Sequence, residues 1–392
     1  MMDRRGKDAL ALDQIPIPGA SVQPGFDPIP MWIADMNFPT APSIIQEIQS
    51  RASHPAFGYF RPSQAYFDAI IRWQQERNGV TGLTEEAIGY ENGVLGCLAS
   101  ALRAFTSPGE GIFLHAPAYV GFQHCLKRTG RRPVYSFLKK DREGVWRMDL
   151  AGMDRVIRDH HIHFAIFCSP HNPAGRVWER RELEGAMEVF RKNDCIVFSD
   201  EIWSDLTLPG FRHIPLQAIS EDARSRVIAA YAPSKTFNLA GLVGSYHIIY
   251  DPCLRDRVSY EAAATGYNGM NVLFMHALIG GYSPEGAAWL EELRHVLQEN
   301  TSFAAAFIRE HFEGVEAASP EGTYMLYLDV GSWCRAHDMS VDELLKKGVS
   351  VGVLWQDGRP FQVPDTIRMN LASPFSRVEE AFKRLDRYVF NG

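Results

Sequence analysis

The sequence predicts an α/β fold with a mainly parallel sheet, together with a smaller α+β domain. Short apolar runs rich in β-branched and aromatic residues alternate with segments in which apolar residues recur every three or four positions. Such alternation is typical of parallel strands joined by helices that cover the sheet. From about residue 281 the pattern changes to one long helical stretch followed by isolated strands and helices, which predicts the second domain.

The expected elements follow in chain order. A strand at Ala87–Glu91 is followed by a helix at Cys97–Phe105 and by strands at Gly111–His115, Pro133–Leu138, His163–Cys168, Cys195–Ser199, Arg226–Tyr231 and Ser245–Tyr250. Glu179–Lys192 is a predicted helix, because Leu183, Ala186, Met187 and Phe190 recur at helical spacing. The tail is expected to form a helix at Pro284–Phe312, a strand at Thr323–Val330, an amphipathic segment at Val341–Lys347 and a last helix at Ser376–Phe390.

We expect three parts: residues 1–45 as an arm that joins the small domain, residues 46–280 as the large domain, and residues 281–392 as the small domain. The chain of 392 residues carries 40 basic and 47 acidic side chains without a basic block, which argues against nucleic acid as a partner and favours a small molecule. The six scattered cysteines predict reduced thiols in the cytoplasm. Neither an export signal nor a membrane span is expected.

No metal site is expected. The candidate cluster His160-His161-Ile162-His163 lacks a second set of ligands, so it is interpreted as a solvated helix end.

Lys235 lies in a tight turn of small residues directly after an apolar strand. A lysine amine forms a Schiff base with the aldehyde of pyridoxal 5'-phosphate (PLP) when a desolvated, cation-rich pocket lowers its pKa. A lone lysine is also compatible with an ordinary solvated charge. The cofactor hypothesis therefore depends on the residues that accompany it.

Two polar residues follow neighbouring strands of the predicted sheet. Asn172, in the turn after His163–Cys168, can donate to the 3'-oxygen of PLP, or it can simply start the turn. Asp200 closes a buried strand and needs a cationic partner, for which the pyridinium nitrogen of PLP is suitable. Alternatively, Asp200 caps a following helix.

Two further sites suit anions. Gly93, Val94 and Leu95 precede the helix Cys97–Phe105, where backbone amides and the helix dipole favour a phosphate. Arg368 lies in a strand-like run, and its planar fork suits a substrate carboxylate, or else a protein carboxylate in a structural ion pair.

The order Asn172, Asp200, Lys235 and Arg368 resembles that of the fold-type I PLP enzymes of the aspartate aminotransferase superfamily. The segments Pro30–Thr40, Ser199–Ile202 and Ser234–Leu242 are most similar to the MalY/PatB-type cystathionine beta-lyase (C-S lyase) family. The resemblance spans nearly the whole chain. It implies a three-layer PLP-transferase fold of the aspartate aminotransferase type, with residues 46–280 as the PLP-binding domain.

The resemblance also implies roles for individual residues. Lys235 matches the Schiff-base lysine and catalytic base, Asp200 the partner of the pyridine nitrogen, and Asn172 the donor to the 3'-oxygen. Tyr119 matches the aromatic residue that stacks on the pyridine ring. Gly93, Val94, Leu95 and Ser234 match the residues that bind the phosphate, and Tyr59 matches a tyrosine that reaches the phosphate of the neighbouring subunit. Arg368 and Ala34 match the residues at the substrate carboxylate. Because the matching tyrosine binds the phosphate in the other subunit, the resemblance implies a homodimer with shared active sites.

Three positions depart from the family patterns. Aminotransferases of this type carry tyrosine and arginine where this chain has Trp203 and Val243, whereas C-S lyases carry histidine at position 203 and aspartate where this chain has Asn37. Trp203 is expected to donate its indole N–H toward the 3'-oxygen, but it cannot exchange a proton as histidine does.

The leading hypothesis is a PLP-dependent C–S β-lyase that eliminates a thiol from cystathionine or another cysteine S-conjugate, giving pyruvate and ammonia. The alternatives are an aminotransferase of an amino acid and a 2-oxo acid, a specialised biosynthetic enzyme for racemisation or β-replacement, and a binding or regulatory protein without activity.

Overall fold

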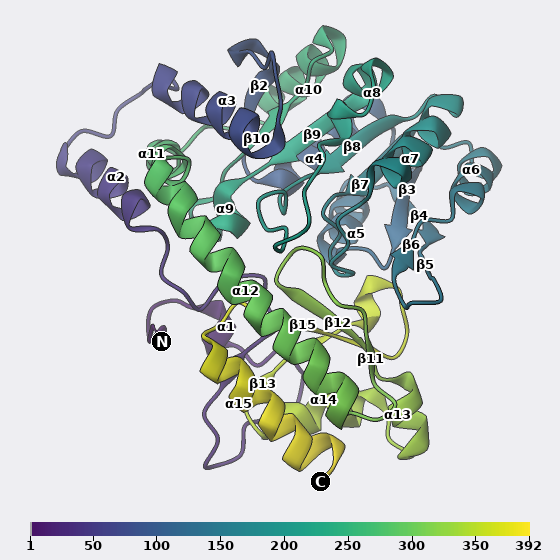
Figure 1. Cartoon of the computed structure of the whole chain (residues 1–392). Coiled ribbons are helices and arrows are strands. Elements are labelled where there is room, and N and C mark those ends of the chain that lie inside the picture. The colour runs from purple at the N-terminus through teal and green to yellow at the C-terminus, as the bar shows by residue number, and fades with distance from the viewer. Residues whose placement is uncertain (1) are drawn as a thin grey trace.

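The computed structural model describes residues 2–392, and a seven-stranded sheet forms the upper part of the molecule in the view of Figure 1. Its strand order is β2-β10-β9-β8-β7-β3-β4, and all strands run in one direction except β10, which is antiparallel to both of its neighbours. The strands are β2 (Ile88–Glu91), β3 (Gly111–Ala116), β4 (Arg132–Phe137), β7 (Phe164–Cys168), β8 (Ile196–Asp200), β9 (Val227–Tyr231) and β10 (Ser245–Ile248). The expected mainly parallel α/β sheet is thus confirmed.

Helices cover both faces of this sheet. Successive side chains of a strand enter different cores: Phe113 and Val197 pack on one face, whereas Ile112 and Phe198 pack on the other. Because both faces are covered, the central strands are apolar almost throughout. The helices before residue 282 are α1 (Leu10–Asp13), α2 (Pro42–Ser53), α3 (Gln64–Asn78), α4 (Val94–Phe105), α5 (Val120–Arg128), α6 (Leu150–Asp159), α7 (Arg180–Lys192), α8 (Glu221–Arg226), α9 (Pro233–Thr236), α10 (Pro252–Ala264) and α11 (Val272–Gly281).

A second, antiparallel sheet has its own core. It has the order β11-β12-β15-β14, and β1 from the N-terminal region pairs in parallel with β13 beside it. This links the N-terminal segment to the C-terminal part of the chain. The strands are β1 (Ile29–Pro30), β11 (Glu316–Ala317), β12 (Met325–Asp329), β13 (Val353–Leu354), β14 (Gln356–Asp357) and β15 (Thr366–Asn370), with helices α13 (Gly331–Ala336), α14 (Val341–Ser350) and α15 (Phe375–Leu385).

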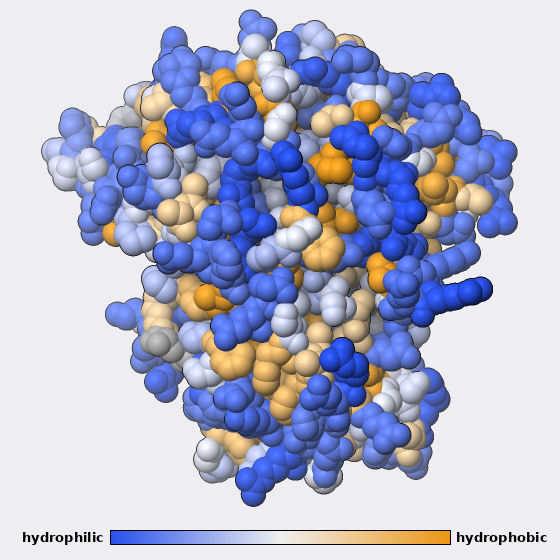
Figure 2. All heavy atoms as spheres, viewed as in Figure 1, coloured by the Kyte–Doolittle hydropathy of each residue, from blue (hydrophilic) through white to orange (hydrophobic). Residues whose placement is uncertain are grey.

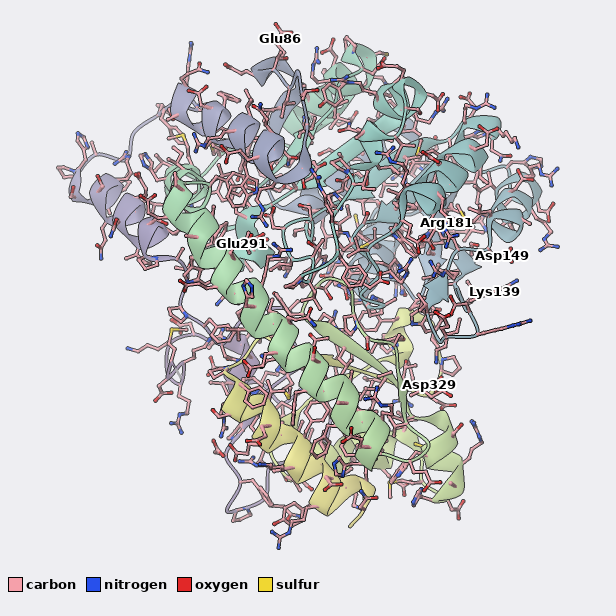
Figure 3. The ribbon with its side chains drawn as sticks, in the orientation of Figure 1. Glu86, Lys139, Asp149, Arg181, Glu291 and Asp329 are labelled. Atoms are coloured by element: carbon pink, nitrogen blue, oxygen red, sulfur yellow. The ribbon has the colours of Figure 1, made fainter. Side chains whose placement is uncertain are left out.

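The long helix α12 (Pro284–His311) connects the two cores (Figure 1). Its first half contributes Leu290 to the core of the large sheet, and its second half contributes Ile308 to the core of the second sheet. Glu291 of α12, labelled in Figure 3, pairs with Arg77 of α3 at 2.6 Å. The helix is therefore fixed to both parts of the molecule.

A hairpin of β5 (Lys139–Lys140) and β6 (Trp146–Arg147) lies beside α6. Lys139 of this hairpin pairs with Asp149, the N-cap residue of α6, at 2.6 Å (Figure 3). The ion pair is largely exposed and contributes little to stability.

Several element boundaries differ from the expected ones. Helix α4 begins at Val94 instead of Cys97, because Gly93 adopts a φ of 78° and ends the preceding turn there. Strand β12 begins at Met325, since Thr323 has a φ of 67° and cannot continue a strand. The last helix changes to a π-helical turn at Asp386–Phe390.

Polar and charged residues predominate on the face in Figure 2, with apolar residues scattered among them. Within residues 2–392, no helix combines the length and the hydropathy that crossing a bilayer requires.

Candidate active site

A cavity of about 210 Å³ lies at the carboxyl ends of the parallel strands. Polar residues that follow different strands meet there, as expected for an open α/β sheet. The cavity is lined by Ala34, Gly93, Val94, Leu95, Tyr119, Cys168, Asn172, Asp200, Ile202, Trp203, Ala232, Ser234, Lys235, Ala240, Val243 and Gly244. The structure thus brings together the predicted site residues except Tyr59 and Arg368, and Arg368 contacts the lining residue Asn172.

Lys235 lies on the short helix α9, which follows β9 and has Pro233 at its first position. The proline fixes φ at a value suited to a helical first turn, so the chain turns sharply after the strand. Lys235 Nζ donates to the carbonyl oxygen of Ala34 at 2.9 Å. Burial, assisted by the positive charge of Arg368, lowers the pKa of Lys235 to about 8. A substantial fraction of the amine is therefore unprotonated near neutral pH.

Asp200 is the last residue of β8, and its side chain is buried. Burial raises the pKa of this carboxyl to about 7, although the nearby Lys235 opposes the shift. Its Oδ1 accepts from the backbone N–H of Ile202 at 3.1 Å. The following residues form turns instead of a helix, so Asp200 is not a helix cap. A bound cation is the group that would keep this carboxyl ionised.

Glu201 fixes the segment after β8 from behind the cavity, and the sequence analysis did not single it out. This fully buried carboxylate accepts hydrogen bonds from Ser199 Oγ at 2.9 Å, Tyr231 OH at 2.6 Å and the backbone N–H of Leu216 at 3.1 Å, and it pairs with His213 Nε2 at 2.7 Å. Because these partners come from several elements, the position of Asp200 is determined by tertiary contacts.

Arg368 of β15 reaches the site from the second sheet. Its Nη1 donates to Asn172 Oδ1 at 2.9 Å and its Nη2 to the carbonyl oxygen of Trp32 at 3.2 Å. Its Nε is buried without a partner, and burial lowers the pKa of Arg368 to about 10. Within residues 2–392, no carboxylate lies within 4.0 Å of this guanidinium. The alternative of a structural ion pair with a protein carboxylate is therefore not formed among these residues.

The remaining predicted residues line the cavity from other sides. Gly93, Val94 and Leu95 form its edge at the N-terminus of α4. The N–H of Gly93 donates to the carbonyl oxygen of Glu91 at 2.8 Å, whereas the N–H groups of the first helical turn have no acceptor within the helix and favour an anion. The ring of Tyr119 has room because residue 121 is glycine: a Cβ there would lie 2.3 Å from Tyr119 Cε1.

Trp203 and Val243, which depart from the family patterns, both line the cavity. Trp203 is buried in the cavity wall, and its ring meets Tyr324 edge-on at 4.7 Å. Val243, with a φ of 41°, leaves an apolar side chain at the rim where an aminotransferase carries arginine. Asn37 is buried elsewhere: its Nδ2 donates to Ser373 Oγ at 2.8 Å, and its Oδ1 accepts from Arg4.

Tyr59 does not join the site of its own chain. It is fully exposed and borders a separate surface hollow with Phe57 and Phe60.

Apart from Val243, five lining residues were not predicted as site residues: Cys168, Ile202, Ala232, Ala240 and Gly244. Cys168 is the last residue of β7, so its place at a strand end was a usable signal. The others are apolar residues in turns, and nothing in their local pattern distinguishes them from core residues.

Comparison with known proteins places this architecture in a family. Residues 29–385 match the model of the aminotransferase class I and II family. The chain belongs to this family. Cystathionine beta-lyase PatB of Bacillus subtilis strain 168 is 34% identical over 323 residues, which are 82% of each chain. Protein MalY of Escherichia coli K12 is 30% identical over 363 residues, 90% of each chain.

Among solved structures, cystalysin from Treponema denticola, which contains a pyridoxal 5'-phosphate cofactor, superposes with a TM-score of 0.90 and 28% identity. The match covers 99% of this chain and 97% of cystalysin. These findings confirm the family resemblance drawn from the motifs and the aspartate aminotransferase type of fold.

Proposed function

We propose that this member of the aminotransferase class I and II family is a PLP-dependent C–S β-lyase acting on cystathionine or a related cysteine S-conjugate. Its similarity to PatB, named a cystathionine beta-lyase, and to PLP-containing cystalysin supports this activity. The observation that carries the proposal is the cavity itself. It gathers a lysine of lowered pKa and a buried carboxyl, and the lining residue Asn172 accepts from a buried arginine whose Nε has no protein partner.

The residues of the cavity fit PLP in charge and position. The amides of Gly93, Val94 and Leu95, together with Ser234, are suited to the phosphate, and the ring of Tyr119 to stacking on the pyridine. Asp200 would gain a cationic partner in the pyridine nitrogen, which would offset the desolvation of its carboxylate. Asn172 and the indole of Trp203 are donors for the 3'-oxygen.

When bound, PLP supplies an electron sink for the pair left on the amino-acid Cα after deprotonation. Arg368 binds the substrate carboxylate through its free Nε and so orients the amino acid. The carbonyl oxygen of Ala34 holds Lys235 Nζ on the side of the cavity where that carboxylate lies.

Lys235 Nζ then accepts the Cα proton. The electron pair of the broken Cα–H bond forms the Cα–Cβ double bond, and the pair of the Cβ–S bond leaves with sulfur as a thiolate. Hydrolysis of the released 2-aminoacrylate gives pyruvate and ammonia. Lys235 thus starts the reaction, and its protonated amine can return the proton to the leaving thiolate.

The residues around Lys235 favour elimination over transamination. Trp203 and Val243 occupy the positions at which aminotransferases of this type carry tyrosine and arginine. Neither side chain can act as an acid or a base.

A homodimer with shared active sites forms part of the proposal. The full exposure of Tyr59, with Phe57 and Phe60 beside it, supports a contact with a second copy. In that dimer Tyr59 reaches the phosphate in the partner's cavity. All six cysteines are free thiols, which supports the expected reducing, cytoplasmic environment.

A substrate panel assayed for two products tests the activity. The PLP-loaded protein is supplied with cystathionine and other cysteine S-conjugates, and pyruvate and free thiol are measured together. Parallel reactions contain an amino acid and a 2-oxo acid, and transfer of the amino group is measured. We expect equimolar pyruvate and thiol. Transfer of the amino group without formation of pyruvate would show that the protein is an aminotransferase and not a lyase.

Complementation tests the shared sites. A Tyr59→Ala chain and a Lys235→Ala chain, each inactive, are co-expressed with different tags, and mixed dimers are isolated. If Tyr59 serves the partner's cavity, the mixed dimer regains one intact site and measurable activity. A monomer in light scattering, or a mixed dimer without activity, contradicts this arrangement.

A further inference from the structure

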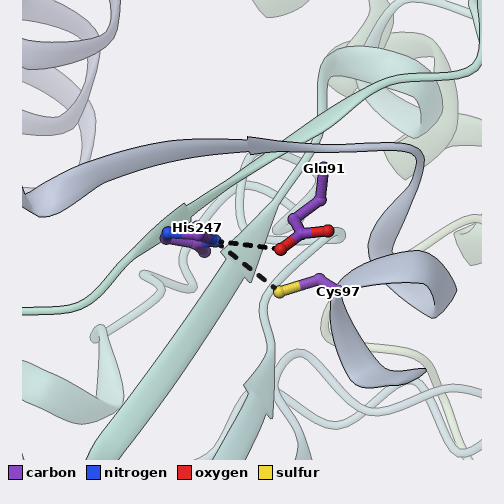
Figure 4. Close-up of side chains that lie close together, drawn as sticks. All are labelled: Glu91, Cys97 and His247. Carbon is purple, nitrogen blue, oxygen red and sulfur yellow. Dashed lines mark hydrogen bonds and ion pairs between the residues drawn. The ribbon is translucent and has the colours of Figure 1, made fainter. Parts of the chain in front are cut away.

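A buried cluster outside the cavity gathers three metal-ligating side chains. Glu91 is the last residue of β2, His247 lies on the neighbouring strand β10, and Cys97 lies on α4 (Figure 4). Their exposed fractions are 1%, 2% and 0%. A candidate ligand atom of each lies within 4.8 Å of those of the other two.

The spacing of the three atoms suits a shared ion better than direct hydrogen bonds. His247 Nδ1 lies 3.5 Å from Glu91 Oε1 and 4.0 Å from Cys97 Sγ. An N–H···O hydrogen bond has a length of about 2.7–3.2 Å. Ligands bound to one zinc ion at about 2.0–2.3 Å lie roughly 3.3–4 Å from each other.

Glu91 has an unmet need for a positive partner. Its Oε1, which faces His247, accepts no hydrogen bond, and its Oε2 has only a long contact of 3.4 Å from Ser100 Oγ. A buried carboxylate without a cation or good donors is costly. A cation bound at this place would therefore offset the buried charge of Glu91.

The opposite strand is shaped to hold the imidazole. Gly89 of β2 is paired with His247 in the sheet, and a Cβ at position 89 would lie 2.1 Å from His247 Nε2. Glycine is thus required for the ring to lie where Nδ1 faces Glu91 and Cys97.

We propose that Glu91, Cys97 and His247 bind one divalent transition-metal ion, zinc being the ion that best suits this donor set. The ion neutralises Glu91 and converts Cys97 to a thiolate, whose proton is released on binding. It connects β2, β10 and the first turns of α4, the helix whose N-terminus borders the cavity. Because the cluster is closed to solvent, the ion enters during folding. This structural role goes beyond the proposed lyase activity.

Metal analysis of the full-length, PLP-loaded protein tests the site. The protein is expressed with added zinc, dialysed against a weak chelator and analysed by mass spectrometry for metals. We expect about one zinc per chain, and less than about a tenth of that in Cys97→Ser and His247→Gln. Cys334→Ser, which removes a buried thiol in the second core, should retain the metal.

Cobalt provides a second measurement that needs no variant. Protein expressed with cobalt in place of zinc should show a thiolate-to-cobalt charge-transfer band in the difference spectrum against the zinc form. The proposal is overturned if the wild-type protein binds no metal, if the variants keep it as an adventitious ion only, or if the cobalt form lacks the band. Metal content is independent of turnover, so a failed lyase assay does not affect this result.

Discussion

Replacing Arg368 by glutamine tests whether this arginine binds the substrate or stabilises the fold. Its guanidinium is buried, its Nε has no hydrogen-bond partner, and none of the carboxylates in residues 2–392 pairs with it. Removing it therefore leaves no protein anion unpaired, and the free energy of unfolding should change little or rise. A structural ion pair predicts the opposite, a loss of about 3–5 kcal/mol.

The catalytic effect should be large. Truncating one member of a buried, hydrogen-bonded charge pair costs about 2–5 kcal/mol, and here the unpaired member is the substrate carboxylate. At 1.36 kcal/mol per factor of ten, kcat/KM should fall roughly 30- to 5,000-fold. The coupled pyruvate assay measures this loss, and thermal unfolding of the same samples measures stability.

Arg384→Gln is the matched control. Arg384 is also buried, but it pairs with Glu380 and, at 2.6 Å, with Asp27. We expect it to lower the melting temperature while leaving kcat/KM of the folded protein unchanged. If Arg368→Gln instead destabilises the protein as Arg384→Gln does and retains kcat/KM, the assignment of Arg368 to the substrate carboxylate is wrong.

Three other outcomes are expected. Lys235→Ala should abolish turnover and prevent trapping of PLP by borohydride, whereas replacing the exposed Lys192 should change neither; residual full activity would remove Lys235 from the mechanism. The rate at which apoprotein attaches PLP covalently should rise with pH, with a midpoint at about 8. At pH 7.5 about a quarter of an amine with that pKa is unprotonated, against about 0.1% of an amine with the ordinary lysine pKa. A midpoint near 10 in stopped-flow absorbance would contradict the lowered pKa. Gly93→Ala should weaken PLP binding, since a side chain at φ 78° costs about 1–3 kcal/mol of backbone strain; an unchanged dissociation constant in equilibrium dialysis would show that the loop is not used.

Much of the site could be predicted from order along the chain. Asn172, Asp200 and Lys235 each follow a strand, and parallel strands bring their carboxyl ends to one edge of the sheet. Strand order alone therefore predicts that Asp200, at the end of β8, and Lys235, directly after β9, lie in one cavity, as the structure shows.

The local residue pattern did not predict features that depend on backbone conformation or on burial. The start of α4 depended on the positive φ of Gly93, which a helical periodicity does not reveal. Glu201 and the cluster of Glu91, Cys97 and His247 were missed because they are isolated polar residues within otherwise ordinary segments. The partners of Glu201 come from β8, β9 and the loop between them, and His247 lies 150 residues from Cys97 along the chain.

The sequence by itself determined the fold class, the family and the lysine to which a cofactor can attach, because periodicity and strand-end motifs are local properties. Only the tertiary structure decided the chemical state of these groups. Burial lowers the pKa of Lys235 and raises that of Asp200, and packing of the second sheet brings the guanidinium of Arg368 to the side-chain oxygen of Asn172. Desolvation and the presence or absence of a partner charge arise from contacts between distant segments, so no local pattern of residues encodes them.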